Sequence, residues 1–190
     1  MANYIDEWNA AVNRTRKFGL DVPPYEPAIN KLWLDANAHA RFPYVVRDAI
    51  GEVPPEEIGL QCMSIHYRLQ SVVQDWLGCP ALYTIGWIDD ETPTGMFRFD
   101  DAFIQDRLDN GHPSSQVNLH TWLTLPSMEV IDVSLATSIA LVQKKPALMG
   151  GVIAQLSDGL KGMKYKPMLV GSDFIFKTSL LKKVTIFETD

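Results

Sequence analysis

The stretch that decides the fold is Val117-Asn118-Leu119-His120-Thr121-Trp122-Leu123-Thr124-Leu125-Pro126-Ser127-Met128-Glu129-Val130-Ile131-Asp132. Two segments rich in strand-forming residues flank a proline-containing turn, and this pattern predicts a β-hairpin. Side chains alternate between the two faces of a strand. One face therefore carries His120, Trp122 and Thr124, while the other is largely apolar and carries Leu119, Thr121, Leu123 and Leu125.

The length of the turn decides where Asp132 points. If Pro126-Ser127-Met128 form a three-residue turn, Trp122 pairs with Asp132. Asp132 then shares the His120 face, diagonally across from it, with about 7–8 Å between the Cα atoms. A carboxylate at that distance can reach an imidazole nitrogen and fix its tautomer. A two-residue turn would send Asp132 to the other face, and the hairpin would then carry only one solvated histidine and one aspartate near a turn.

Cys62 supplies a nucleophile for this pair. It stands where the chain leaves the 56–61 segment and enters a stretch with a helical apolar stripe, Cys62 to Leu77, ended by Gly78. Free N–H groups and the positive end of the dipole at a helix start favour a thiolate, and the same N–H groups stabilise an oxyanion. Taken alone, a cysteine is more often a packing residue. Cys79 follows the helix end, where the dipole disfavours a thiolate, so we interpret it as structural.

The rest of the chain predicts further helices and strands around this centre. Helices are expected at residues 3–18, 28–40, 99–108, 135–142 and 147–156, with Pro43, Pro54 and Pro55 in a less regular segment. Strands are expected at residues 81–88, 168–170 and 184–187, beside the hairpin. Helices followed by a meandering sheet predict an α+β domain.

The order of these residues resembles the transglutaminase-like group of the papain-like cysteine fold. The matching pieces are Gln61-Cys62, His120-Thr121-Trp122 and Val130-Ile131-Asp132, with 58 positions from Cys62 to His120 and 12 from His120 to Asp132. The resemblance covers residues 57–134. It implies a helix bearing Cys62 packed on an antiparallel sheet and a Cys-His-Asp acyl-transfer site. The chain departs from the group at Met63, where an aromatic is usual, and in lacking a glycine before Gln61.

The length and the lack of a composition shift predict a single domain over residues 1–190. Residues 1–55 form an N-terminal helical cap, 56–134 the catalytic core, and 135–190 the C-terminal helices that also complete the sheet. Cys62 is expected to attack an amide or ester carbonyl, His120 to move the proton and Asp132 to orient His120. The backbone N–H of Cys62, together with Gln61, is expected at the oxyanion, and Trp122 as a wall of the site. His66 is expected either to line the cleft or to be a satisfied core histidine.

Composition excludes several other classes. The net charge is −6 with scattered basic residues, which disfavours a nucleic-acid partner, and no apolar run has the length of a membrane span. The first eight residues lack the basic and apolar regions of a signal peptide, so a cytoplasmic protein is expected, although leaderless export leaves no mark. Cys62, His66 and His120 make a weak zinc signal, and we expect no metal and no cofactor.

Three functions remain open. The first is a cysteine amidase or peptidase acting on a peptide or amide, which includes a bacterial amidase of cell-wall peptides delivered into a rival cell. The second is a transglutaminase-like or other acyltransferase with the same triad. The third is a binding domain that keeps the fold without catalysis.

Overall fold

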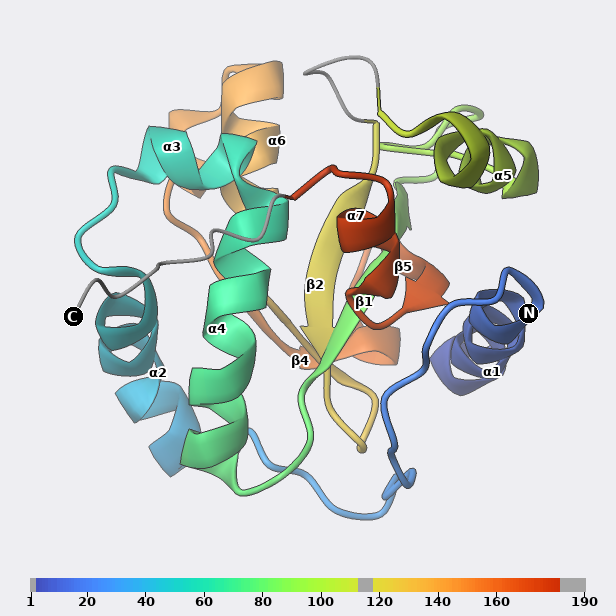
Figure 1. The fold of residues 1–190 in the computed structure, drawn as a ribbon. Coiled ribbons are helices and arrows are strands. Elements are labelled where there is room, and N and C mark those ends of the chain that lie inside the picture. Colours follow the sequence, from blue (N-terminus) through green and yellow to red (C-terminus); the bar gives the residue numbers. More distant parts are fainter. Residues whose placement is uncertain (1–2, 113–117, 182–190) are drawn as a thin grey trace, which may run out of the picture.

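A five-stranded antiparallel sheet with helices on both faces forms the structure, a computed structural model that describes residues 3–112 and 118–181 (Figure 1). The α+β class is thereby confirmed. The helices are α1 (Tyr4–Lys17), α2 (Ala36–Ile50), α3 (Pro55–Leu60), α4 (Cys62–Leu77), α5 (Asp101–Asn110), α6 (Leu135–Gln143) and α7 (Asp173–Lys177). The strands are β1 (Leu82–Asp89), β2 (His120–Thr124), β3 (Glu129–Asp132), β4 (Ile153–Leu156) and β5 (Lys164–Val170). No helix in these ranges is long and apolar enough to cross a membrane.

The hairpin of β2 and β3 has the predicted register. The strand order is β4-β3-β2-β1-β5, and every neighbouring pair is antiparallel. Leu123 pairs with Ile131, and the N–H of Leu125 donates to the carbonyl of Glu129 at 2.9 Å. Met128 closes the turn with a positive φ of 68° and donates its N–H to the carbonyl of Leu125 at 2.9 Å. The three-residue turn is therefore confirmed, and Asp132 lies on the His120 face.

The two faces of the sheet pack against different helices. Leu69 and Val73 of α4 join the apolar cluster that contains Leu123, whereas Trp8 of α1 joins the cluster that contains Trp122. The body of the Cys62 helix thus covers the face opposite Trp122. His120 is the first residue of β2, and two residues from the start of α4, Cys62 and His66, lie close to it.

The helix expected at residues 28–40 is wrong. Backbone N–H groups of this segment are taken by distant acceptors: Ala28 donates to the carbonyl of Pro126 at 2.8 Å, and Trp33 donates to the carboxylate of Glu129 at 2.9 Å. The helix α2 begins later, where the side chain of Asp35 accepts the N–H of Ala38 at 2.8 Å, and it runs through Pro43. A capped start and an apolar buried face outweigh the hydrogen bond that a proline removes.

The helix expected at residues 147–156 is also wrong. Gly150 has a positive φ of 71°, which ends a short 3-10 turn at Pro146–Leu148. The following residues pair with β3 as the edge strand β4, with Gln155 opposite Val130. Pairing with a strand outweighs the weak helical preference of a segment with two glycines. The strand expected at 184–187 lies outside the described residues.

Strand β1 has a glycine, Gly86, directly opposite His120 of β2. Gly86 pairs with His120 on one side, and the ladder to β5 changes register between Ile85 and Gly86. A Cβ atom at this position would collide with the backbone carbonyl of Lys166 and lie 2.6 Å from the ring of Trp122. Glycine therefore permits the close approach of β5 and of Trp122 beneath the histidine.

Candidate active site

Cys62 is the first residue of α4 and is half-buried. Gln61 is the N-cap, but its side chain makes no capping hydrogen bond to the helix. Two contacts hold this first turn in place: the ring N–H of His66 donates to the carbonyl of Cys62 at 2.9 Å, and the hydroxyl of Tyr83 donates to the carbonyl of Met63 at 3.0 Å. The first N–H groups of a helix have no partner within the helix. Cys62 thus stands at a fixed, uncapped helix start.

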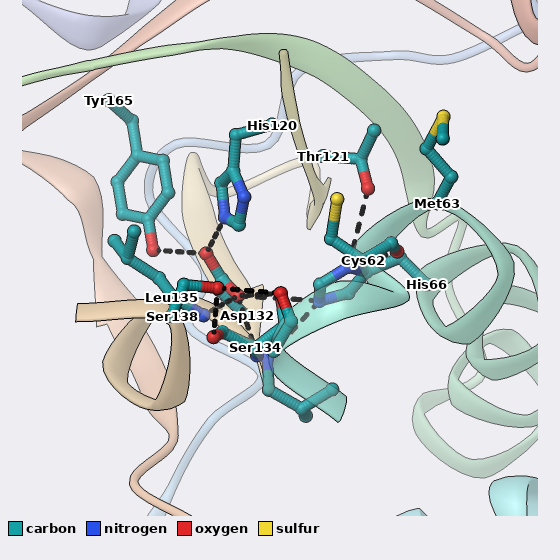
Figure 2. Close-up of polar contacts among 12 residues, drawn as sticks. Cys62, Met63, His66, His120, Thr121, Asp132, Ser134, Leu135, Ser138 and Tyr165 are labelled. Atoms are coloured by element: carbon teal, nitrogen blue, oxygen red, sulfur yellow. Dashed lines mark hydrogen bonds and ion pairs between the residues drawn. The ribbon is translucent and has the colours of Figure 1, made fainter. Parts of the chain in front are cut away.

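His120 and Asp132 form a buried pair at the end of the hairpin. Nε2 of His120 lies 2.6 Å from Oδ2 of Asp132, and both side chains are at most 1% exposed. Figure 2 shows Cys62 at the start of α4, near the His120 ring. Because Nε2 is engaged with Asp132, Nδ1 is the nitrogen that remains for the thiol. The structure therefore brings together the three residues expected to form the triad.

Asp132 is held by hydrogen bonds on both oxygens. Oδ2 also accepts from the hydroxyl of Tyr165 at 2.8 Å. Oδ1 accepts from the backbone N–H groups of Ser134 and Leu135, each at 2.9 Å, and from the hydroxyl of Ser134 at 3.2 Å. These donors stand at the start of α6, where a carboxylate is also favoured by the helix dipole. The carboxylate has little freedom to rotate away from His120.

The pKa of His120 is raised and the pKa of Asp132 is lowered by their contact. Burial alone would lower the pKa of His120, but the charge and hydrogen bond of Asp132, together with a hydrogen bond and the charge of Cys62, raise it to about 10. Burial would raise the pKa of Asp132, but the charge and hydrogen bond of His120, with the N–H of Ser134, hold it well below its ordinary value. An imidazolium beside a carboxylate is the state that this arrangement favours.

His66 is neutral, whereas the neighbouring His120 is protonated. Nδ1 donates to the carbonyl of Cys62, and Nε2 accepts the N–H of Val133 at 3.1 Å, so the ring is neutral. Burial lowers the pKa of His66 to about 4. Nε2 also lies 3.5 Å from Oδ1 of Asp132, but an acceptor nitrogen facing a carboxylate oxygen is no ion pair. His66 therefore supports the backbone around the triad, and it is fully buried rather than lining an open cleft.

The other two predicted site residues, Gln61 and Trp122, both lie next to a member of the triad. Gln61 is exposed and adjacent to Cys62, and its amide oxygen accepts from the hydroxyl of Ser64 at 3.4 Å. Trp122 is fully buried, stacks on His120 at 6.1 Å between ring centroids, and donates its Nε1–H to the hydroxyl of Tyr4 at 2.8 Å. Trp122 thus shields His120 from the α1 side. The oxyanion role of Gln61 stays a prediction.

Several contacts of the triad were not predicted from the sequence. Tyr165 comes from β5, far along the chain, and no local pattern marks it. Phe97 lies on the loop after β1 and stacks on His120 at 5.2 Å with an angle of 21° between the rings. A local signal did exist for Ser134 and Leu135, since an aspartate just before a helix commonly accepts the N–H groups two and three residues on.

Cys79 differs from Cys62 as expected. It is 8% exposed, and burial raises its pKa to about 11. Within residues 3–112 and 118–181, no group of three or more His, Cys, Asp or Glu side chains is placed to hold a metal ion. Among the described residues, Cys62 is thus the cysteine that lies beside a histidine–carboxylate pair.

Comparisons of this chain with protein-family models, with curated proteins and with solved structures found no match. The chemistry of the site therefore has to be argued from its own geometry.

Proposed function

We propose that this protein is a cysteine-dependent acyl-transfer enzyme with a transglutaminase-like core, and that it hydrolyses an amide or peptide bond. The observation that carries the proposal is the 2.6 Å contact of His120 Nε2 with the buried Asp132, beside Cys62 at an uncapped helix start. A nucleophile, a base and an orienting carboxylate in this relation are the elements of nucleophilic catalysis.

The first half of the reaction forms a thioester. The proton of the Cys62 thiol resides on Nδ1 of His120 as a thiolate–imidazolium pair, and the thiolate sulfur attacks the substrate carbonyl carbon. The oxyanion is stabilised by N–H groups at the start of α4. The C–N bond then breaks, and His120 delivers its proton to the leaving amine. Asp132 stabilises the imidazolium throughout and keeps Nδ1 aimed at the sulfur.

The second half releases the acyl group. His120 takes a proton from water, the resulting hydroxide attacks the thioester carbonyl, and the C–S bond breaks to give a carboxylic acid and the Cys62 thiol. An amine in place of water gives a new amide, which is the transglutaminase-like alternative. The donor class is an amide or peptide, with bacterial cell-wall peptides as one candidate.

Acyl-enzyme trapping tests this proposal without knowledge of the natural substrate. The full chain is incubated with p-nitrophenyl acetate and analysed by intact and peptide mass spectrometry. We expect one acetyl group on Cys62, a burst of nitrophenol, and loss of both in Cys62→Ala. Cys79→Ala is the matched control and should keep the burst. Acetylation spread equally over both cysteines, or an undiminished burst in Cys62→Ala, would contradict the proposal.

The two second-step alternatives are separated by adding acceptors. Purified peptidoglycan is digested and its fragments are analysed, and a glutamine-containing peptide is offered together with a primary amine. New free carboxylates at peptide bonds support hydrolysis, whereas amine incorporation supports acyl transfer. Both products should disappear in Cys62→Ala.

A further inference from the structure

Phe97 covers one side of the His120 ring. Its half-buried side chain lies nearly parallel to the imidazole, with 5.2 Å between the ring centroids and 21° between the planes. It comes from the loop between β1 and α5, which is separate in sequence from β2, β3 and α4. The contact is therefore a tertiary one that the loop has to be built to make.

Contacts of the two residues before it, Gly95 and Met96, fix the position of Phe97 in the loop. Ile88 and Met96 exchange two backbone hydrogen bonds, at 2.9 and 2.8 Å, immediately before Phe97. Gly95 has a positive φ of 63°, and a Cβ atom there would lie 2.8 Å from the ring of Trp87. These contacts leave the loop little freedom to withdraw the aromatic ring.

The backbone of Phe97 itself is strained. Its φ is 62°, a left-handed conformation that an aromatic residue rarely adopts. Such strain persists only where the surrounding structure imposes it, and it concentrates at functional sites. Here the strained residue places its ring against the proposed base.

From these observations we propose that Phe97 is a positioning residue, which acts through His120 and keeps that ring stacked and in its protonated form beside Asp132. The inference rests on the proposed function, since it concerns the base of the same triad. The electron-rich face of an aromatic ring attracts a cation placed over it.

Stepwise fluorination of Phe97 tests this role without changing the shape of the side chain much. Mono-, tri- and pentafluorinated phenylalanine are introduced at this position in the full chain, and the titration midpoint of His120 is followed by NMR of its ring nitrogens. Each step weakens the negative ring face, so the midpoint should fall progressively, by about 0.5 pH unit in all. A midpoint that stays constant across the series overturns the inference.

Phe103 provides the matched control. It is a half-buried phenylalanine of α5 that contacts Phe99 rather than His120. Fluorination there should leave the His120 midpoint unchanged, and an equal shift from both positions overturns a specific role for Phe97. Phe97→Leu should lower the midpoint as the pentafluorinated ring does, and Phe97→Trp should restore it. A midpoint in Phe97→Leu equal to that of the native chain also refutes the inference.

A separate measurement, the reactivity of Cys62, tests the proposed function itself. The rate of Cys62 alkylation by iodoacetamide is measured against pH on the native chain, with each cysteine resolved by mass spectrometry. A rate at Cys62 near pH 6 no greater than that of an ordinary thiol contradicts the acyl-transfer proposal. The His120 midpoint still reports the effect of Phe97 in that case, so the two results can be told apart.

Discussion

Two buried histidines should give this protein a stability maximum between their opposite titrations. The rings of His66 and His120 lie 6.4 Å apart, and each side chain is at most 1% exposed. Burial lowers the pKa of His66 to about 4, while Asp132 raises the pKa of His120 to about 10. In the unfolded chain both return to about 6.5. Folding therefore changes proton binding in opposite directions at the two sites.

The signs and sizes follow from linkage. His120 has a raised pKa in the folded state, so its contribution is complete below about pH 6.5 and is lost as pH rises to about 10. His66 has a lowered pKa, so its contribution is complete above about pH 6.5 and is lost as pH falls to about 4. One proton is worth about 1.4 kcal/mol per pH unit, which bounds the loss at about 5 kcal/mol on the basic side and about 3 kcal/mol on the acidic side.

Urea unfolding at a series of pH values, from about 4.5 to about 9.5, measures the decline in the free energy of unfolding on the acidic and on the basic side of the maximum. In His120→Gln the free energy of unfolding should lose its decline above about pH 6.5, and in His66→Gln it should lose the decline below that value. His39→Gln is the exposed control. Its ring contacts two backbone carbonyls, which raises its pKa, but its effect should stay below about 1 kcal/mol because water screens it. A decline on the basic side that is unchanged in His120→Gln would refute the reasoning.

Three further substitutions test the frame of the site. Gly86→Ala should destabilise the protein by about 3 kcal/mol or more, because its Cβ atom meets the carbonyl of Lys166, and a thermal melt should show it. Asp132→Asn should cost about 3–5 kcal/mol in urea, since it leaves buried donors unpaired, whereas Asp101→Asn in a half-exposed ion pair should cost less than about 1 kcal/mol. Tyr165→Phe should cost about 1–3 kcal/mol and raise the pKa of the carboxylate, seen by NMR; an unchanged pKa would contradict its hydrogen bond.

The hairpin was predictable because its determinants are local. Alternation and a short proline-containing turn set the register, and that register places Asp132 beside His120. The Cys62 helix was predictable for the same reason, since its apolar stripe and the glycine that ends it, Gly78, are adjacent in sequence. These local rules were enough to name the three residues that the structure brings together.

The failures came where distant groups decide the backbone. Glu129 is 2% exposed and accepts the N–H groups of Trp33 and Leu34, which keeps that segment out of a helix. Nothing near residue 33 in the sequence indicates such a partner. Tyr165 and Phe97 reach the triad in the same way, through contacts that only the folded chain defines.

The packing of the first helix on the last strand affects how the chain folds during translation. The first helix, α1, packs chiefly on the last strand, β5, and the N–H of Val170 donates to the hydroxyl of Thr15, 155 positions earlier, at 2.9 Å. On a ribosome, the apolar face of α1 that carries Trp8 cannot be covered completely until β5 has emerged. Tyr165 reaches Asp132 from that same strand. The nascent chain therefore exposes part of an apolar surface for most of its translation. The hydrogen bond from Tyr165 to Asp132 can form only after β5 has emerged.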